Sequence, residues 1–147
     1  MTYGTFDLTE HTQLSIRGTT GTHPDSEYVF GVFIGTDELH AEKGGKTPDI
    51  SAYDDMDWSK AVELAKWATE TEFKKNDITE FPLTKHTVVA CLTDYARDDF
   101  TFHIRIQIRG PLVFPRFVAT DQVEWERALQ MAKWILEWDE AFKKARE

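Results

Sequence analysis

The sequence has too few cysteines for a disulfide within the chain and no apolar run long enough for a membrane-spanning helix. Its one cysteine, Cys91, can form no disulfide within the chain. Cys91 lies in the apolar run 88–92, which favours a buried thiol over a reactive one. No apolar run approaches the roughly 20 residues of a membrane-spanning helix, and residues 1–12 lack the basic start and apolar centre of a secretory signal. We therefore expect a cytoplasmic protein without membrane contact.

Positive charge is scarce as well. The 147 residues contain 17 Lys and Arg against 26 Asp and Glu, which gives a formal net charge of −9. Such a surface repels anionic membranes and the phosphate backbone at long range, which disfavours a nucleic-acid partner. The hydrophobic fraction of 41% is ample for a packed core. The charge favours a partner that is a protein.

Spacings typical of metal sites and catalytic sites are absent from the sequence. His23, His40 and His103 have no metal-ligand spacing relative to one another or to Cys91, so we expect no metal and no cofactor. Residues 44–47 end like a phosphate-binding loop, but His40 stands where that motif needs its first glycine. Because no base and nucleophile have a catalytic spacing either, we expect a protein that is not an enzyme.

A helical segment that occurs twice is the most prominent feature of the sequence. Residues 58–70 and 125–137 agree at six of thirteen positions, two of which are tryptophan. Upstream, residues 6–12 and 81–87 agree at five of seven positions. The upstream segments lie further apart than the helical ones, so the second copy is shorter between its two matches. Because both matches occur in the same order, the chain contains two copies of one unit.

The two copies, residues 1–75 and 76–147, predict a single domain with pseudo-twofold symmetry. Alternation and turn residues predict three or four strands in each copy, followed by a helix. We expect strands at residues 12–18 and 28–35 in the first copy and at residues 87–92 and 100–109 in the second. Further candidate strands are residues 3–8, 37–42 and 50–53 in the first copy, and residues 79–83 and 116–119 in the second. Asp54 and Asp121 are predicted to cap the two helices. This is an α+β fold, an antiparallel sheet with two equivalent helices.

The order of these elements resembles that of the PUR-repeat and Whirly-type single-strand-binding domains, in which four strands and a helix occur twice. The resemblance is one of element order over the whole chain. It implies an alternative function, the binding of single-stranded nucleic acid or a nucleotide.

The two longest predicted strands differ on one face when they are aligned on Gly35 and Gly110. The first strand has three apolar side chains there: Phe30, Val32 and Ile34. The second has basic and polar side chains there: Arg105, Gln107 and Arg109, preceded by His103. We expect the apolar set to form a subunit or partner contact. For the basic set, pairing with neighbouring acids is the favoured interpretation, and a surface that binds an anion or nucleotide is the alternative.

The tryptophans of the repeated helix divide into two kinds. At 100° per residue, Trp58 and Trp125 lie in the apolar arc and are predicted to be core. Trp67 and Trp134 lie on the opposite, polar side, with Trp138 close to Trp134. Two uses are open for these outer tryptophans: packing of the two helices against each other, or an aromatic anchor for a partner.

Two histidines, His11 and His86, occupy equivalent places in the two copies. Such a pair supports a two-histidine phosphoesterase as a further alternative. In those enzymes one residue separates the histidine from the hydroxyl, whereas Thr12 and Thr87 follow directly here, on the wrong face of the strand. A structural use of this motif at the start of a strand is the favoured interpretation.

The sequence as a whole predicts a small acidic binding protein that acts through protein–protein contacts. An inhibitor or adaptor of the kind encoded by phage or mobile elements fits this description, and a homodimer is open as an alternative.

Overall fold

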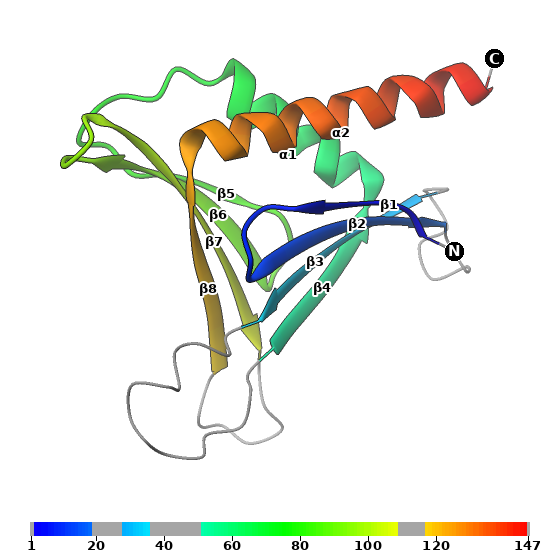
Figure 1. Ribbon diagram of the computed structural model, residues 1–147, viewed down its shortest axis with the longest axis horizontal. Helices are drawn as coiled ribbons and strands as arrows, with labels where there is room; N and C mark the ends of the chain where they lie inside the picture. The colour runs from blue at the N-terminus through cyan, green and yellow to red at the C-terminus, as the bar shows by residue number, and fades with distance from the viewer. Residues whose placement is uncertain (1, 19–27, 36–50, 109–116, 147) are drawn as a thin grey trace.

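The computed structural model describes residues 2–18, 28–35, 51–108 and 117–146 (Figure 1). The first half contains β1 (Thr2–Asp7), β2 (Thr12–Gly18), β3 (Tyr28–Gly35), β4 (Ser51–Asp57) and α1 (Trp58–Glu70). The second half contains β5 (Thr79–Pro82), β6 (Thr87–Asp94), β7 (Asp99–Ile108), β8 (Phe117–Glu124) and α2 (Trp125–Arg146). The α+β class and the repeated strand-then-helix unit are thereby confirmed.

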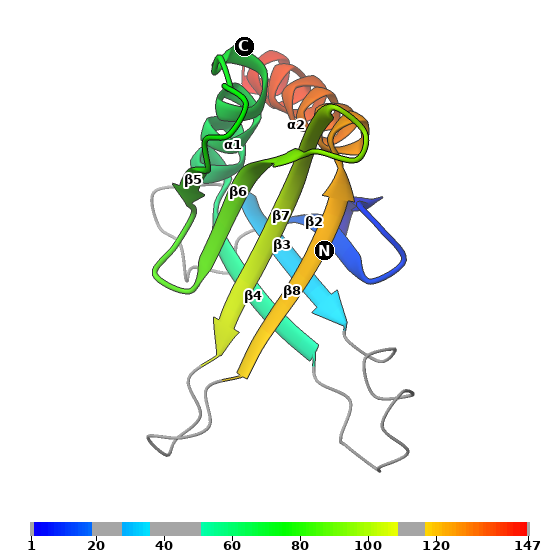
Figure 2. The ribbon, with the colours of Figure 1, turned by 90° about the vertical axis from the view of Figure 1, so that its left-hand side faces the viewer.

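The strands form two antiparallel four-stranded sheets, whereas the sequence predicted one. Sheet A has the order β1-β2-β3-β4, and sheet B has the order β5-β6-β7-β8. The strands of the two sheets cross, and both helices lie at the same end of them (Figure 2). The expected strand at residues 37–42 lies outside the described residues. The pseudo-twofold symmetry stays a prediction.

The equivalence of the two sheets follows from their pairing registers. Thr12 pairs with Ile34 in sheet A, and the matching Thr87 pairs with Ile106 in sheet B. Ile34 therefore corresponds to Ile106, whereas the alignment on Gly35 and Gly110 had matched it with Arg109 and was wrong by three positions. An odd shift exchanges the two faces of a strand, because successive side chains point to opposite sides.

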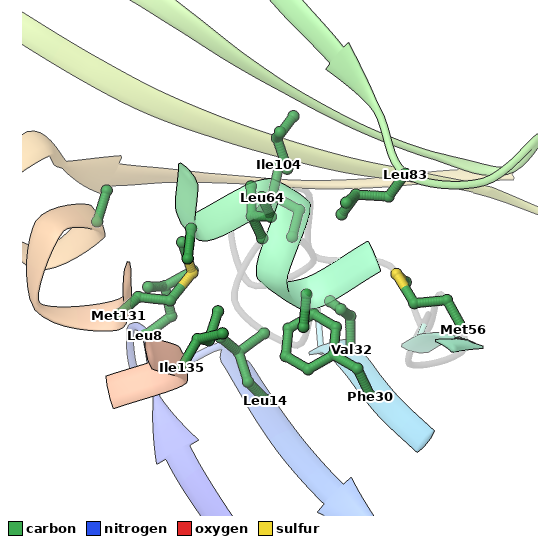
Figure 3. Packing of buried hydrophobic residues seen from close by; sticks show 14 of the residues in the cluster. Leu8, Leu14, Phe30, Val32, Met56, Leu64, Leu83, Ile104, Met131 and Ile135 are labelled. Atoms are coloured by element: carbon green, nitrogen blue, oxygen red, sulfur yellow. The ribbon is translucent and has the colours of Figure 1, made fainter. Parts of the chain in front are cut away.

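This correction changes the role of the apolar strip on β3. Phe30, Val32 and Ile34 are all fully buried in the core and are not a partner surface. Their counterparts on β7, which are buried as well, are Phe102, Ile104 and Ile106. The core lies between the helices and the inner faces of both sheets, with Leu64 of α1 and Met131 and Ile135 of α2 on the helical side (Figure 3).

A threonine pair from each half binds a carboxylate of the other half. The hydroxyls of Thr9 and Thr12 both donate to Oδ2 of Asp121 on β8, with 2.5 Å from Thr12 Oγ1. The Thr9 hydroxyl also accepts the backbone N–H groups of His11 and Thr12, at 3.0 and 3.1 Å. This turn is what places both hydroxyls beside one carboxylate.

The same arrangement occurs in the other direction. The hydroxyls of Thr84 and Thr87 donate to Oδ2 of Asp54 on β4, with 2.5 Å from Thr84 Oγ1. The two aspartates were expected to cap the helices, and that prediction is wrong, because β4 and β8 continue beyond them to Asp57 and Glu124. Asp57 takes the N-cap position of α1 without a side-chain cap hydrogen bond. The threonines of the His-Thr motif therefore have a structural role.

The outer tryptophans pack on strands of the opposite half. Trp67 of α1 stacks on Phe81 of β5, with ring centroids 5.6 Å apart. Trp134 of α2 packs on Phe6 of β1, with centroids 5.3 Å apart. The two helices do pack against each other, whereas these rings of Trp67 and Trp134 contact phenylalanines on strands. The inner Trp58 is buried, as predicted, and donates from Nε1 to Asp139 of α2 at 3.1 Å.

Candidate functional site

The outer face of sheet B carries most of the predicted ligand residues. His103, Arg105 and Gln107 alternate with buried residues of β7 and so share this face. Arg109 lies outside the described residues. His103 is half-buried, and desolvation lowers the pKa of its imidazole. Arg105 is exposed and has no ion pair with any residue that the structure describes.

A hollow of about 220 Å³ lies beside these side chains. Val88, Ala90 and Leu92 of β6 give it an apolar floor, and Glu80 of β5 and Thr120 of β8 stand at its borders with His103 and Arg105. The hollow therefore combines a small apolar surface with one cationic and one anionic group.

The outer face of sheet A carries two exposed aromatic rings. Phe33 and Tyr53 are paired across β3 and β4, and their exposed fractions are 43% and 47%. Gln13 and Asp7 continue this row onto β2 and β1, joined by a 2.9 Å hydrogen bond from Gln13 Nε2 to Asp7 Oδ1. Neither Phe33 nor Tyr53 is among the candidate residues predicted from the sequence. The correct register of β3 is the signal that finds both.

Tyr53 is held in place across the sheet. A Cβ atom at Gly31 would lie 2.8 Å from the Tyr53 hydroxyl oxygen and 2.7 Å from Ser15 Oγ, so only glycine leaves room for the phenol. Arg17 donates to the Tyr53 hydroxyl and lies over its ring, with Cζ 5.3 Å from the centroid. The same guanidinium is 3.4 Å from Asp55. Desolvation raises the pKa of Tyr53. The ring is thus exposed and yet fixed.

A groove of about 450 Å³ runs between α1 and β5. The stacked rings of Trp67 and Phe81 line it together with Pro82, and the charged groups along it come from α1. These charged residues are Lys60, Glu63, Lys66 and Glu70. Trp67, one of the predicted partner residues, therefore borders a surface groove.

The remaining predicted partner residues lie against the first strand. Trp134 is half-buried against Phe6. Trp138 is also half-buried, and a Cβ atom at Gly4 would lie 2.9 Å from its Cζ2. These two rings cover β1, and their use in partner binding stays a prediction.

The histidines and the cysteine form no metal site within the described ranges. There, no group of three or more His, Cys, Asp or Glu side chains is arranged to hold a metal ion. The backbone carbonyls of His11 and His86 each accept an N–H group at 2.8 Å, from Gly35 and Gln107. Cys91 is buried, as predicted, and desolvation raises its pKa to about 11. In the part of the chain that the structure describes, no helix is long and apolar enough to span a bilayer.

Comparisons with known proteins assign no family. No protein-family model matches the chain, and no curated protein matches it. Among solved structures, the chain is similar to a crystal structure of Trypanosoma bruciei MRP1/MRP2. The identity is 14% and the TM-score 0.46, over 93% of this chain and 81% of that one. A likeness of this size shows neither a family nor a function.

Proposed function

We propose that this chain is a non-enzymatic binding protein, an inhibitor or adaptor, whose partner is another protein docked on the outer face of sheet A. One observation carries the proposal: Phe33 and Tyr53 lie exposed side by side on that face. Burying one such ring contributes about 1.5–3 kcal/mol, and aromatic side chains are enriched among the residues that dominate protein interfaces.

The fixed position of Tyr53 favours binding further. Arg17 and the space over Gly31 already hold the phenol in one conformation. A side chain that is ordered before docking loses less conformational entropy on docking, so more of the contact free energy remains for affinity.

Charge favours a protein over a nucleic acid as the partner. The strands of sheet A direct three carboxylates to the same face as the aromatic pair: Asp7, Asp55 and Asp57. The arginine of this face, Arg17, is engaged with Tyr53 and Asp55. With a formal net charge of −9 over the chain, such a surface repels a phosphate backbone and attracts a partner with basic residues around an apolar contact.

Native mass spectrometry of the tagged protein, purified from the cells that make it, tests this proposal. We expect one protein in fixed stoichiometry with the wild type, and its loss from the double variant Phe33→Ser/Tyr53→Ser. The control is Tyr95→Ser, which removes a ring that is 75% exposed on the β6–β7 turn and should retain the partner. A bound oligonucleotide in place of a protein, or a partner that stays with the double variant, would refute the proposal.

A second candidate function, the binding of an anion or nucleotide, is favoured by the exposed Arg105 beside the hollow on sheet B. It predicts that a labelled single-stranded oligonucleotide binds at low salt and that Arg105→Ala abolishes this binding. Fluorescence anisotropy measures both, and no binding at low salt would exclude this candidate.

A further inference from the structure

The guanidinium of Arg127 on α2 is held by three groups at the edge of sheet A. Its Cζ lies 4.2 Å from the ring centroid of Phe6. Nε donates to the backbone carbonyl of Asp7 at 3.2 Å, and Nη2 donates to the same oxygen. Nη1 donates to Oε1 of Gln130 at 2.7 Å. An aromatic face, a main-chain carbonyl and a side-chain oxygen one helical turn away together accommodate this cation.

The edge of sheet B, where α1 covers β5, has three equivalent groups. Phe81 and Pro82 of β5 are equivalent to Phe6 and Asp7 of β1. Phe6 pairs with Leu14 of β2, and Phe81 pairs with Val89 at the matching position of β6. Glu63 takes the place of Gln130 in the matched helices. A tryptophan of the covering helix packs against the phenylalanine in both halves, with centroids 5.3 and 5.6 Å apart.

The arginine itself is missing from this second site. Lys60 stands where Arg127 stands, and its ammonium is 3.2 Å from Glu63 instead of lying over the phenylalanine. Both side chains of this pair are about half exposed, so solvent screens their attraction. The space that the Arg127 guanidinium fills at the edge of sheet A is here part of the open groove between α1 and β5.

We propose that this groove binds the guanidinium of an arginine side chain from a partner protein. The Phe81 ring supplies a face for a cation–π contact, and the Pro82 carbonyl supplies an acceptor. Glu63 supplies a carboxylate where the occupied site has the amide of Gln130. A planar guanidinium bonds a carboxylate in a bidentate way that an ammonium does not. Glu70 adds a second carboxylate along the groove.

The charge of the chain agrees with this occupant. A net charge of −9 attracts basic partners at long range. This inference rests on the proposed function in one respect, that the partner is a protein. The groove is formed by α1 and β5, whereas Phe33 and Tyr53 lie on β3 and β4.

The test is a titration with N-acetyl-arginine amide, followed by the indole N–H signal of Trp67 in ¹H–¹⁵N NMR spectra. We expect a saturable shift of this signal, with the Trp134 signal unmoved as the internal control, because Arg127 occupies that site. The uncharged N-acetyl-citrulline amide and the non-planar N-acetyl-lysine amide should cause no such shift. We expect Glu63→Gln to weaken binding about tenfold, since a charge-assisted bond is replaced by a neutral one.

The decisive variant is Lys60→Arg, which should place an arginine of the chain itself in the groove and abolish binding of the probe. Lys74→Arg, at an exposed position outside the groove, is the matched control and should bind the probe like the wild type. Equal shifts with the lysine probe, or full binding by Lys60→Arg, would overturn the inference. The probe needs no partner, so binding of the probe stands even if no partner protein is captured, and its failure leaves the proposal for sheet A intact.

Discussion

Thr87→Val tests whether the threonine–aspartate contacts between the two halves stabilise the fold. The Thr87 side chain is 0% exposed, and its hydroxyl donates to a carboxylate oxygen of Asp54 in the other half. Valine has nearly the same shape, so the substitution removes the hydrogen bond without leaving a cavity. A hydrogen bond to a charged group contributes about 1.5–3 kcal/mol. Because Thr84 still donates to the same carboxylate, we expect a loss near the lower end, about 2 kcal/mol.

Urea unfolding, followed by tryptophan fluorescence, measures this loss as a lower denaturation midpoint at an unchanged slope. For a chain of this size the same loss lowers the melting temperature by roughly 4–8 °C. Thr5→Val is the control, because Thr5 is exposed on the outer side of β1, and it should change the free energy of unfolding by less than about 0.5 kcal/mol.

A double-mutant cycle with Asp54→Ala isolates the contact itself. If the threonine and the aspartate stabilise each other, their losses are not additive, and the coupling free energy should be about 1 kcal/mol or more. Thr12→Val should behave like Thr87→Val, because its hydroxyl donates to Asp121 in the same way. A loss below about 0.5 kcal/mol for Thr87→Val, or additive losses in the cycle, would refute the structural role of this contact.

Three further outcomes follow from the geometry. Gly31→Ala should displace the Tyr53 phenol, because the new Cβ would lie 2.8 Å from its hydroxyl oxygen. We expect the free energy of unfolding to fall by about 1–3 kcal/mol, and unchanged NMR signals of the Tyr53 ring would contradict the displacement. Cys91, with its pKa raised to about 11, should react with a thiol reagent at pH 8 only after unfolding, and rapid labelling of the native protein would contradict its burial. Since burial lowers the pKa of His103 below its value in the unfolded chain, its neutral form is favoured in the folded state; its contribution to stability is present above the unfolded pKa and decreases as the pH falls through the folded pKa. His103→Gln should therefore flatten the decline in stability below about pH 6.5, and an identical decline would exclude this assignment.

The sequence determined the order of elements and the repeated unit. The matched segments at residues 58–70 and 125–137 carry helical periodicity and flanking turn residues, which are local properties of the chain. For the same reason the buried Trp58 and the buried Cys91 were predictable. Trp58 lies in the apolar arc of its helix and Cys91 in the apolar run 88–92, and both are buried.

The faces of the long strands were decided by the tertiary structure. β3 is apolar at nearly every position, so alternation within it does not tell which side meets the core. Only pairing with β2 and β4 places Val32 inside and Phe33 outside, and the matching pairing of β7 places Arg105 outside. The alignment of β3 on β7 was wrong by three positions. Because an odd shift exchanges the two faces of a strand, residues of the core were taken for a candidate binding surface.

The contacts between the two halves could not be predicted from the sequence either. Asp54 and Asp121 have the spacing of helix caps, but each meets a threonine pair from the other half of the chain, which no local pattern encodes. Arg127 and Lys60 are a conservative pair in the alignment, yet one fills a site and the other leaves it open. The repeat fixes which residues correspond, because correspondence is a property of the chain. Which of two corresponding sites is occupied depends on side chains that meet only when the halves pack together.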